Sequence, residues 1–142
     1  MDINRKGKIV KINGNMIAAV TDNFIIQNEV AYVIHGQEHL KAEVIRIRGN
    51  VAEMQLFEST TGLRIGEEVE FTGDLLSVEL GPGLLGQVFD GLQNPLPTLA
   101  QKCGFFLKRG IYFDALPDES EWEFTPLVKK GDKVRPGEKL GW

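Results

Sequence analysis

The feature that most constrains the fold is a series of short apolar runs separated by turns of glycine and asparagine. Residues 8–12 and 16–20 flank Asn13-Gly14-Asn15, and residues 40–48 and 51–57 flank Gly49-Asn50. Glycine and asparagine tolerate the positive φ that tight hairpins need, and apolar residues that alternate with polar ones are typical of half-buried strands. The first half of the chain is therefore predicted to form antiparallel β-structure.

The alternation slips phase once within residues 40–48, at Val44-Ile45. A β-bulge absorbs such a slip by bending the strand, and a small sheet needs bends of this kind to close on itself. We therefore expect a small closed β-barrel over residues 1–73.

Glycine and proline become more frequent after the predicted barrel, and Asn94-Pro95-Leu96-Pro97 blocks a continuous helix. Residues 74–104 are interpreted as a linker in which only Pro97–Cys103 can form a helical turn or two. Residues 105–142 are expected to begin a second β-rich unit of the barrel-sandwich type, starting with a strand at 105–113. The predicted fold class is therefore mainly β.

Composition narrows the functional classes. The chain has 142 residues, 16 Lys plus Arg and 20 Asp plus Glu, so its net charge of −4 argues against a general polyanion-binding surface. The single Cys103 cannot form an internal disulfide, and the N-terminal residues lack the apolar run of a secretory signal, which predicts a cytoplasmic location. No apolar stretch approaches the roughly 20 residues of a membrane-spanning helix, so membrane association is expected only through partners.

One glycine-rich motif resembles a phosphate-binding loop. Its glycines are Gly81, Gly83 and Gly86, and it follows an expected strand at residues 75–80. Pro82 has no N–H to offer a phosphate, Gln87 stands where a P-loop has lysine, and Val88 stands where it has a hydroxyl. The motif is interpreted as a structural turn.

Two other motifs suggest catalysis. His35-Gly36-Gln37-Glu38-His39 spells the HxxEH of some zinc peptidases, but that motif needs a helix, and Gly36 between two apolar runs predicts a hairpin. Cys103 as a nucleophile needs a neighbouring base, and the only histidines are these two. We predict no catalytic, cofactor-binding or metal-binding residue in this chain.

A longer motif, GLLGQVFDGLQNPL at residues 83–96, points to a family. Together with Val78–Pro82 before it, this motif resembles the segment in which the catalytic A subunit of V-type and archaeal-type rotary ATPases leaves its N-terminal barrel. The resemblance runs from Gly7-Lys8-Ile9-Val10 to Gly131-Asp132-Lys133-Val134. Residues 105–142 resemble the start of the insert, or bulge, that A subunits carry and B subunits lack.

The resemblance implies a role in assembly. In this family, three A and three B subunits alternate in a ring whose barrels form a crown, and the insert reaches the peripheral stalk. ATP hydrolysis or synthesis is coupled to H⁺ or Na⁺ transport. The P-loop and catalytic glutamate of A subunits lie beyond the insert, so ATP and Mg²⁺ are expected to bind the intact subunit and this chain is expected to be inactive alone. The resemblance places it in the cytoplasm, in a head peripheral to the membrane.

Charged residues on the predicted barrel have two interpretations, which the sequence leaves open. They either set the register between neighbouring subunits or form a solvated face. The residues are Glu67, Glu68, Glu70, Arg46, Arg48 and Arg64.

Parts of the sequence also suggest two other functions. Residues 128–141 resemble half of a biotinyl or lipoyl carrier domain, but the lysine of the other half typically lies beside methionines, and the three methionines are at positions 1, 16 and 54. An OB-like nucleic-acid-binding barrel is suggested by Arg5, Lys6, Lys8 and Lys11. Such sites also need aromatic platforms, and the first 56 residues contain only Phe24 and Tyr32.

Overall fold

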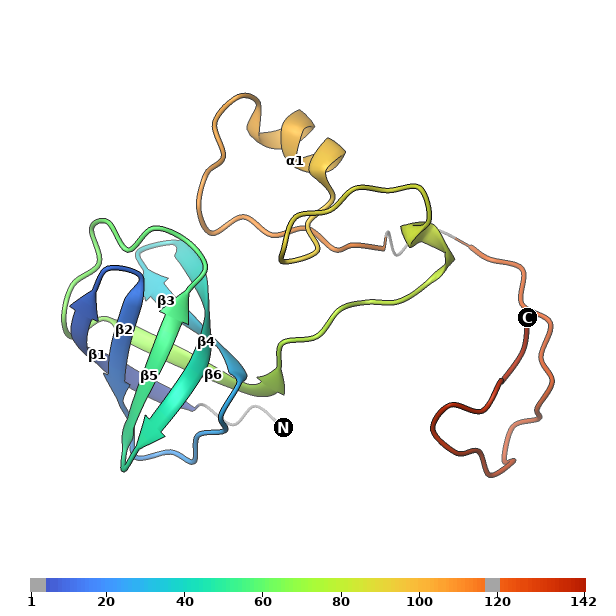
Figure 1. Ribbon diagram of the computed structural model, residues 1–142, viewed down its shortest axis with the longest axis horizontal. Helices are drawn as coiled ribbons and strands as arrows, with labels where there is room; N and C mark the ends of the chain where they lie inside the picture. Colours follow the sequence, from blue (N-terminus) through green and yellow to red (C-terminus); the bar gives the residue numbers. More distant parts are fainter. Residues whose placement is uncertain (1–4, 117–120) are drawn as a thin grey trace.

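The computed structural model describes residues 5–116 and 121–142 (Figure 1). Residues 1–4 of the predicted barrel and 117–120 of the predicted insert lie outside the described residues. The elements in chain order are β1 (Lys6–Asn13), β2 (Met16–Val20), β3 (Glu29–His35), β4 (Glu38–Arg48), β5 (Val51–Leu56), β6 (Glu68–Leu75), the 3₁₀ turn η1 (Pro82–Leu84) and α1 (Leu96–Cys103).

The six strands form a closed barrel in the order β1-β2-β5-β4-β3-β6, and every neighbouring pair is antiparallel. Three hairpins, β1-β2, β3-β4 and β4-β5, turn at Gly14, Gly36 and Gly49, each of which has a φ near +60° (61°, 62° and 61°). Each strand has a partner on both sides, which removes the free sheet edges of an open sheet. The predicted closed barrel is confirmed.

Bulges let this small sheet close. In β4, Val44 pairs with Met54 and Arg46 with Glu53, so Ile45 is the extra residue that the phase slip predicted. A similar shift in β1 leaves Val10 without an opposite residue. Both extra side chains are exposed, because each bulge turns one residue outward and returns the following residues to the alternating pattern.

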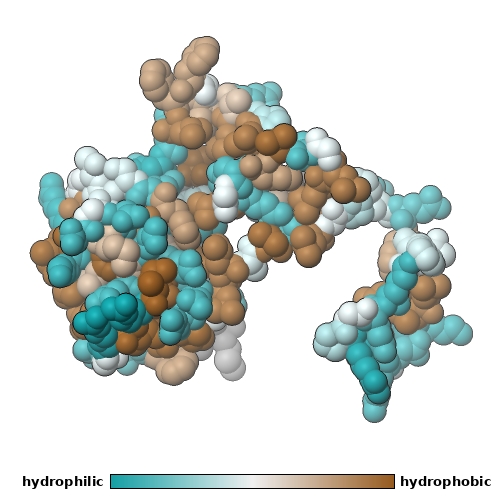
Figure 2. All heavy atoms as spheres, in the orientation of Figure 1, coloured by the Kyte–Doolittle hydropathy of each residue, from teal (hydrophilic) through white to brown (hydrophobic). Residues whose placement is uncertain are grey.

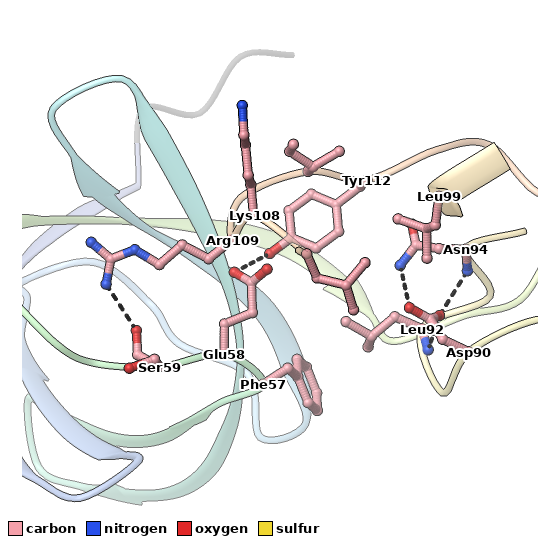
Figure 3. Close-up of a pocket in the computed structure, with 12 residues that line it drawn as sticks. Phe57, Glu58, Ser59, Asp90, Leu92, Asn94, Leu99, Lys108, Arg109 and Tyr112 are labelled. Atoms are coloured by element: carbon pink, nitrogen blue, oxygen red, sulfur yellow. Dashed lines mark hydrogen bonds between the residues drawn. The ribbon is translucent and has the colours of Figure 1, made fainter. Parts of the chain in front are cut away.

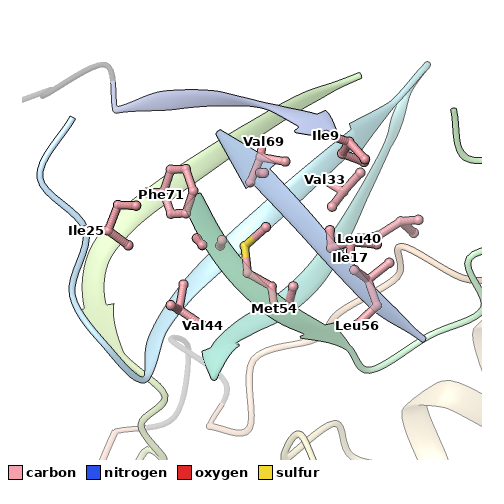
Figure 4. Close-up of a cluster of buried hydrophobic side chains, with 14 residues drawn as sticks. Ile9, Ile17, Ile25, Val33, Leu40, Val44, Met54, Leu56, Val69 and Phe71 are labelled. Atoms are coloured by element: carbon pink, nitrogen blue, oxygen red, sulfur yellow. The ribbon is translucent and has the colours of Figure 1, made fainter. Parts of the chain in front are cut away.

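The barrel interior is filled by side chains from all six strands (Figure 4). Leu40, Met54 and Leu56 are among the largest fully buried side chains, and four alanines with no exposed surface lie between such residues. Mixing large and small side chains is how a narrow barrel fills its centre without a channel. The alanines are Ala19, Ala31, Ala42 and Ala52.

The chain after the barrel lacks both of the strands that the sequence predicted there. The strand expected at residues 75–80 does not form, because β6 ends at Leu75 and residues 76–80 have no neighbouring strand. The expected helical turns are confirmed as α1, which begins at Leu96 with Pro97 in its first turn, where a missing N–H is tolerated. Within the described ranges, no helix has the length and apolar character needed to cross a membrane.

Among the described residues of the predicted second β-rich unit, β-pairing is limited to an antiparallel bridge between Pro126 and Gly141, flanked by backbone hydrogen bonds. The strand expected at Phe105–Phe113 is irregular, which corrects that prediction. A two-stranded ribbon needs a third strand or a packed face to be stable, and residues 121–142 lie away from the barrel (Figure 1). Apolar side chains are exposed along the chain after the barrel (Figure 2), including Leu80, Leu85, Phe105, Phe106 and Trp142.

Candidate functional site

The segment after α1 returns to the barrel and docks where β4 extends past β5 (Figure 3). Pairing between β4 and β5 stops at Ala42 and Leu56, so residues 38–41 of β4 have no β5 partner. We call residues 109–112 the latch, and we call residues 38–41 together with the loop 57–61 the docking edge. Hydrogen bonds from three of the four latch residues reach the docking edge.

Tyr112 makes the deepest contact. Its hydroxyl accepts a hydrogen bond from the Lys41 backbone N–H at 2.8 Å and donates one to Glu58 Oε2 at 3.0 Å. The Tyr32 ring lies edge-on with its centroid 6.4 Å away, and Lys41 Nζ lies 4.7 Å from the Tyr112 ring centroid. Burial raises the pKa of Tyr112, so its hydroxyl stays protonated and remains a donor to the Glu58 carboxylate.

Gly110 brings the backbone of the latch onto the same carboxylate. Its N–H donates to both oxygens of Glu58, at 2.9 and 3.1 Å. Its φ is +72°, and a Cβ at this position would lie 3.3 Å from the Cβ of Glu38. Both the conformation and the close approach require glycine.

Arg109 supplies the third contact, through a guanidinium that bonds in two directions. Nε donates to Glu38 Oε2 at 2.8 Å, and Nη1 donates to the backbone oxygens of Ser59 and Thr61. The planar donor fork of arginine suits such a set of acceptors better than lysine would.

A second set of hydrogen bonds ties Phe113, the residue after the latch, to the linker. The Asp90 carboxylate accepts from the N–H groups of Leu92 and Asn94 and from the Asn94 amide, at 2.8–2.9 Å. The buried Asn94 then accepts from the Phe113 N–H at 2.9 Å. A cavity of about 360 Å³ lies between the two sets of bonds, lined largely by apolar side chains such as Phe57, Leu92, Leu99 and Ile111. The arrangement fastens chain segments together.

Comparison with known proteins identifies the family. Residues 9–73 match the model of the ATP synthase alpha/beta family, beta-barrel domain. The chain is 60% identical over 136 residues to the V-type ATP synthase alpha chain of Treponema denticola, 57% over 137 residues to V-type ATP synthase alpha chain 1 of Treponema pallidum, and 53% over 140 residues to the V-type ATP synthase alpha chain of Borreliella afzelii. The barrel of this chain belongs to the ATP synthase alpha/beta family, and the chain as a whole is similar to V-type ATP synthase alpha chains.

The alignments cover 96–99% of this chain but only 23–24% of each relative, so the chain spans about a quarter of their length. The family's barrel domain corresponds to the closed barrel, whose last strand continues to Leu75. Because the alignment with the Borreliella afzelii protein covers 99% of the chain, the similarity to alpha chains also includes the linker and the latch.

The motifs that suggested catalysis lie apart from the latch or take part in ordinary structure. Gly81 precedes η1 and Gly83 lies within it, and a Cβ on either would contact the side chain of Leu116. His35 and His39 belong to the β3-β4 hairpin, as predicted, and His35 Nδ1 lies 2.7 Å from Glu67 Oε1. Cys103 is the last residue of α1. The described residues contain no cluster of three or more His, Cys, Asp or Glu side chains arranged to hold a metal ion.

Most of the charged residues that either set the register between neighbouring subunits or form a solvated face have partners within the barrel. Lys6 pairs with Glu68 and with Glu70, and Glu53 lies within 4 Å of both Arg46 and Arg48, at 3.8 and 3.6 Å. The arginine side chains of the latter two pairs remain 59% and 64% exposed, so they are still accessible to a neighbour.

The nucleic-acid interpretation loses two of its four basic residues. Arg5 is buried and bonds to Glu29, and Lys6 is held by two glutamates. Tyr32, one of its two aromatic candidates, packs edge-on against Tyr112. These contacts remove Arg5, Lys6 and Tyr32 from such a site, whereas Phe24, Lys8 and Lys11 remain exposed.

Sequence reasoning missed the latch, because it interpreted residues 105–113 as a strand. A signal was present in the triplet Lys108-Arg109-Gly110, which interrupts the apolar run with two cations and a glycine. A strand interior rarely accommodates glycine without a bulge or a close backbone approach, and here the close approach is to Glu38.

Proposed function

We propose that this chain is the N-terminal barrel region of the catalytic alpha, or A, subunit of a V-type rotary ATPase, and that its task is assembly. In this proposal the barrel alternates with the barrels of B subunits to form the crown of a hexameric ring. The observation that carries the proposal is the closed six-stranded barrel within the part of the chain that matches the ATP synthase barrel domain.

The physical properties of the barrel support a mechanical role. A strand with two partners cannot be peeled away without breaking hydrogen bonds on both sides, so a closed barrel resists shear better than an open sheet. Its outer face carries both exposed arginines and exposed apolar side chains such as Val10 and Ile45. A ring subunit needs this combination of a stiff core and a mixed outer surface.

In this proposal, the catalytic chemistry of the full-length alpha subunit takes place in regions other than residues 1–142. We propose ATP hydrolysis or synthesis coupled to H⁺ or Na⁺ transport, with ATP and Mg²⁺ bound beyond residue 142. Residues 105–142 belong to the insert and extend toward the peripheral stalk. The protein works in the cytoplasm, peripheral to the membrane, and this chain alone does not hydrolyse ATP.

The test is assembly of the full-length alpha chain with its B partner, measured by native mass spectrometry at several salt concentrations. Replacing both exposed arginines, Arg46→Ala with Arg48→Ala, is expected to reduce the hexamer population, because complementary charges at a rim mainly govern association. The matched control is Lys129→Ala with Lys130→Ala, which removes two cations from the segment beyond the barrel. Equal hexamer populations in both variants would argue against a ring contact through this face. An alpha chain that lacks the barrel but forms normal rings would refute the assembly role itself.

A further inference from the structure

We infer that the latch makes the barrel the anchor of the segment beyond Phe113, fixing the start of that segment independently of the linker. This anchoring goes beyond the proposed assembly role, and it is tested by contacts within this chain. Those contacts begin at the docking edge.

The docking edge is a place where the closed barrel is locally open. Residues 38–41 of β4 extend past the end of β5, so their N–H and C=O groups on that side have no strand partner. Buried backbone groups must find hydrogen bonds elsewhere. The Lys41 carbonyl accepts from the Phe57 N–H at 3.2 Å, and the Lys41 N–H finds the Tyr112 hydroxyl at 2.8 Å. The latch therefore satisfies one backbone N–H of this edge that strand pairing leaves free.

The latch touches this edge at separated points, and this geometry resists rotation. Arg109 bonds to β4 through Glu38 and to the loop through two backbone oxygens. Gly110 and Tyr112 both donate to the carboxylate of Glu58, and Figure 3 shows the bond from Tyr112. Because several of these bonds involve a charged group, they are among the stronger hydrogen bonds of the molecule.

Two tethers meet at the end of the latch. The latch ties residues 109–112 to the barrel, whereas Asn94 ties the Phe113 N–H to the linker. If the barrel is the anchor, removing the linker tether frees only residues near 113. If the linker is the anchor, removing the contacts of the latch leaves residues 109–113 in place.

Amide exchange and ¹⁵N relaxation by NMR on this chain distinguish the two cases. The informative readout in each variant is a hydrogen bond that the substitution does not itself delete. Tyr112→Phe leaves the bonds between Gly110 and Glu58 intact, so faster exchange of the Gly110 N–H reports undocking of the whole latch. Glu58→Ala leaves the Tyr112 hydroxyl intact, so the Lys41 N–H serves as its reporter.

We expect Gly110 exchange to rise about 10-fold or more in Tyr112→Phe, because the substitution deletes the hydrogen bond from the Lys41 N–H and the one donated to the charged Glu58 carboxylate. In Glu58→Ala we expect about 10-fold or more at Lys41, because a charged acceptor of two groups is lost. Backbone order parameters at residues 109–114 fall in both variants. In Asn94→Ala, only residues 113 and 114 become more mobile. The control Glu43→Ala removes a glutamate from β4 outside the docking edge, and it is expected to leave every latch amide unchanged.

Unchanged reporters in both latch variants would overturn the inference, as would loss of order throughout residues 109–113 in Asn94→Ala. If Glu58→Ala also accelerates exchange in β1 and β2, the substitution has destabilised the barrel as a whole. In that event Tyr112→Phe, which removes one oxygen atom, decides the outcome.

Discussion

Replacing Arg5 by alanine tests how the barrel is held closed. Glu29 has no exposed surface, and its carboxylate accepts from Arg5 Nη1 at 2.8 Å and from Arg5 Nη2 at 3.0 Å. It also accepts from the N–H groups of Ile26 and Gly73, at 2.6 and 2.7 Å. Arg5 donates as well to the Phe24 carbonyl. One carboxylate thus joins the start of β1, the loop before β3 and a bulge in β6, where Phe71 pairs with Ala31 but Leu75 pairs with Glu29.

These hydrogen bonds lie beside the pairing of β1 with β6, the shortest strand pairing of the barrel, which we call the seam. Strands β1 and β6 are paired only from Lys6 to Lys8 on the β1 side, and Arg5 extends that pairing through a bond from the Phe71 N–H to its carbonyl. Arg5→Ala leaves a buried carboxylate with two backbone donors and no counter-charge. Removing one member of a buried ion pair costs about 3–5 kcal/mol.

That cost is a large part of the free energy of unfolding of a small domain, which is about 5–15 kcal/mol. The expected fall in Tm is roughly 12–40 °C, at about 4–8 °C per kcal/mol for a domain of this size. The assay is urea unfolding followed by circular dichroism, with a thermal melt as the second measure. The control Lys6→Ala breaks an ion pair at the same seam whose side chains are about 40% exposed (41% and 42%), so we expect the midpoint to change little.

A double variant separates the cost of the unpaired charge from the value of the pair. Arg5→Met with Glu29→Leu removes both charges and fills a similar volume, and buried pairs replaced in this way are often neutral in stability. We expect it to recover part of the loss, because the unpaired charge is gone but the N–H groups of Ile26 and Gly73 lose their acceptor. If Arg5→Ala unfolds no more easily than Lys6→Ala, the ion pair does not hold the seam and the reasoning is refuted.

Three further outcomes are expected. Burial raises the pKa of both tyrosines, most strongly that of Tyr112, so absorbance at 295 nm will show both ionising above the ordinary value of 10.0. Because the folded state retains these protons, the contribution of the tyrosines to the free energy of unfolding is constant below that pH and falls above it. Tyr112→Phe is expected to reduce this fall. Two normal titrations near that value would contradict this prediction. Gly73→Ala is expected to lower the free energy of unfolding, measured in urea, more than Gly14→Ala does. Both glycines have positive φ, but only a Cβ at Gly73 would lie 2.8 Å from the buried guanidinium of Arg5. Equal losses would show that the bulge can relax. Met54→Ala leaves a void in the filled barrel and is expected to lower the free energy of unfolding by about 2–5 kcal/mol, and a smaller loss would indicate that the barrel collapses around it.

The barrel was predictable because its signals are local. Glycine at the hairpin turns and alternation along the strands specify neighbours that are close in sequence, and the slip at Val44-Ile45 marks the bulge of β4 within a single run of residues. The bulge of β6 was not predicted, because Gly73 looked like the end of a strand. Its role depends on Glu29, whose carboxylate approaches from a distant part of the chain.

The latch was unpredictable for the same reason. The partners of Arg109 and Tyr112 lie about 50 to 70 positions away in the chain, with separations of 48, 50, 54 and 71 residues, and nothing in the local pattern specifies such pairs. The incorrect strand at residues 105–113 arose from apolar and aromatic residues, which favour strands wherever a neighbouring strand exists. Here the neighbour is the unpaired end of β4, and the segment meets it through side chains instead of a ladder.

The latch also has a consequence for how sequence can be exchanged at this position. The chain leaves the barrel at Leu75 and bonds to it again at Arg109, so the residues between form a closed excursion, a long loop whose two ends are both held by the barrel. Lengthening a closed excursion costs little conformational entropy, because the cost grows only with the logarithm of its length. Foreign segments grafted between these two points would therefore leave the direction of the following chain unchanged, which makes the barrel a fixed mount for parts of variable size.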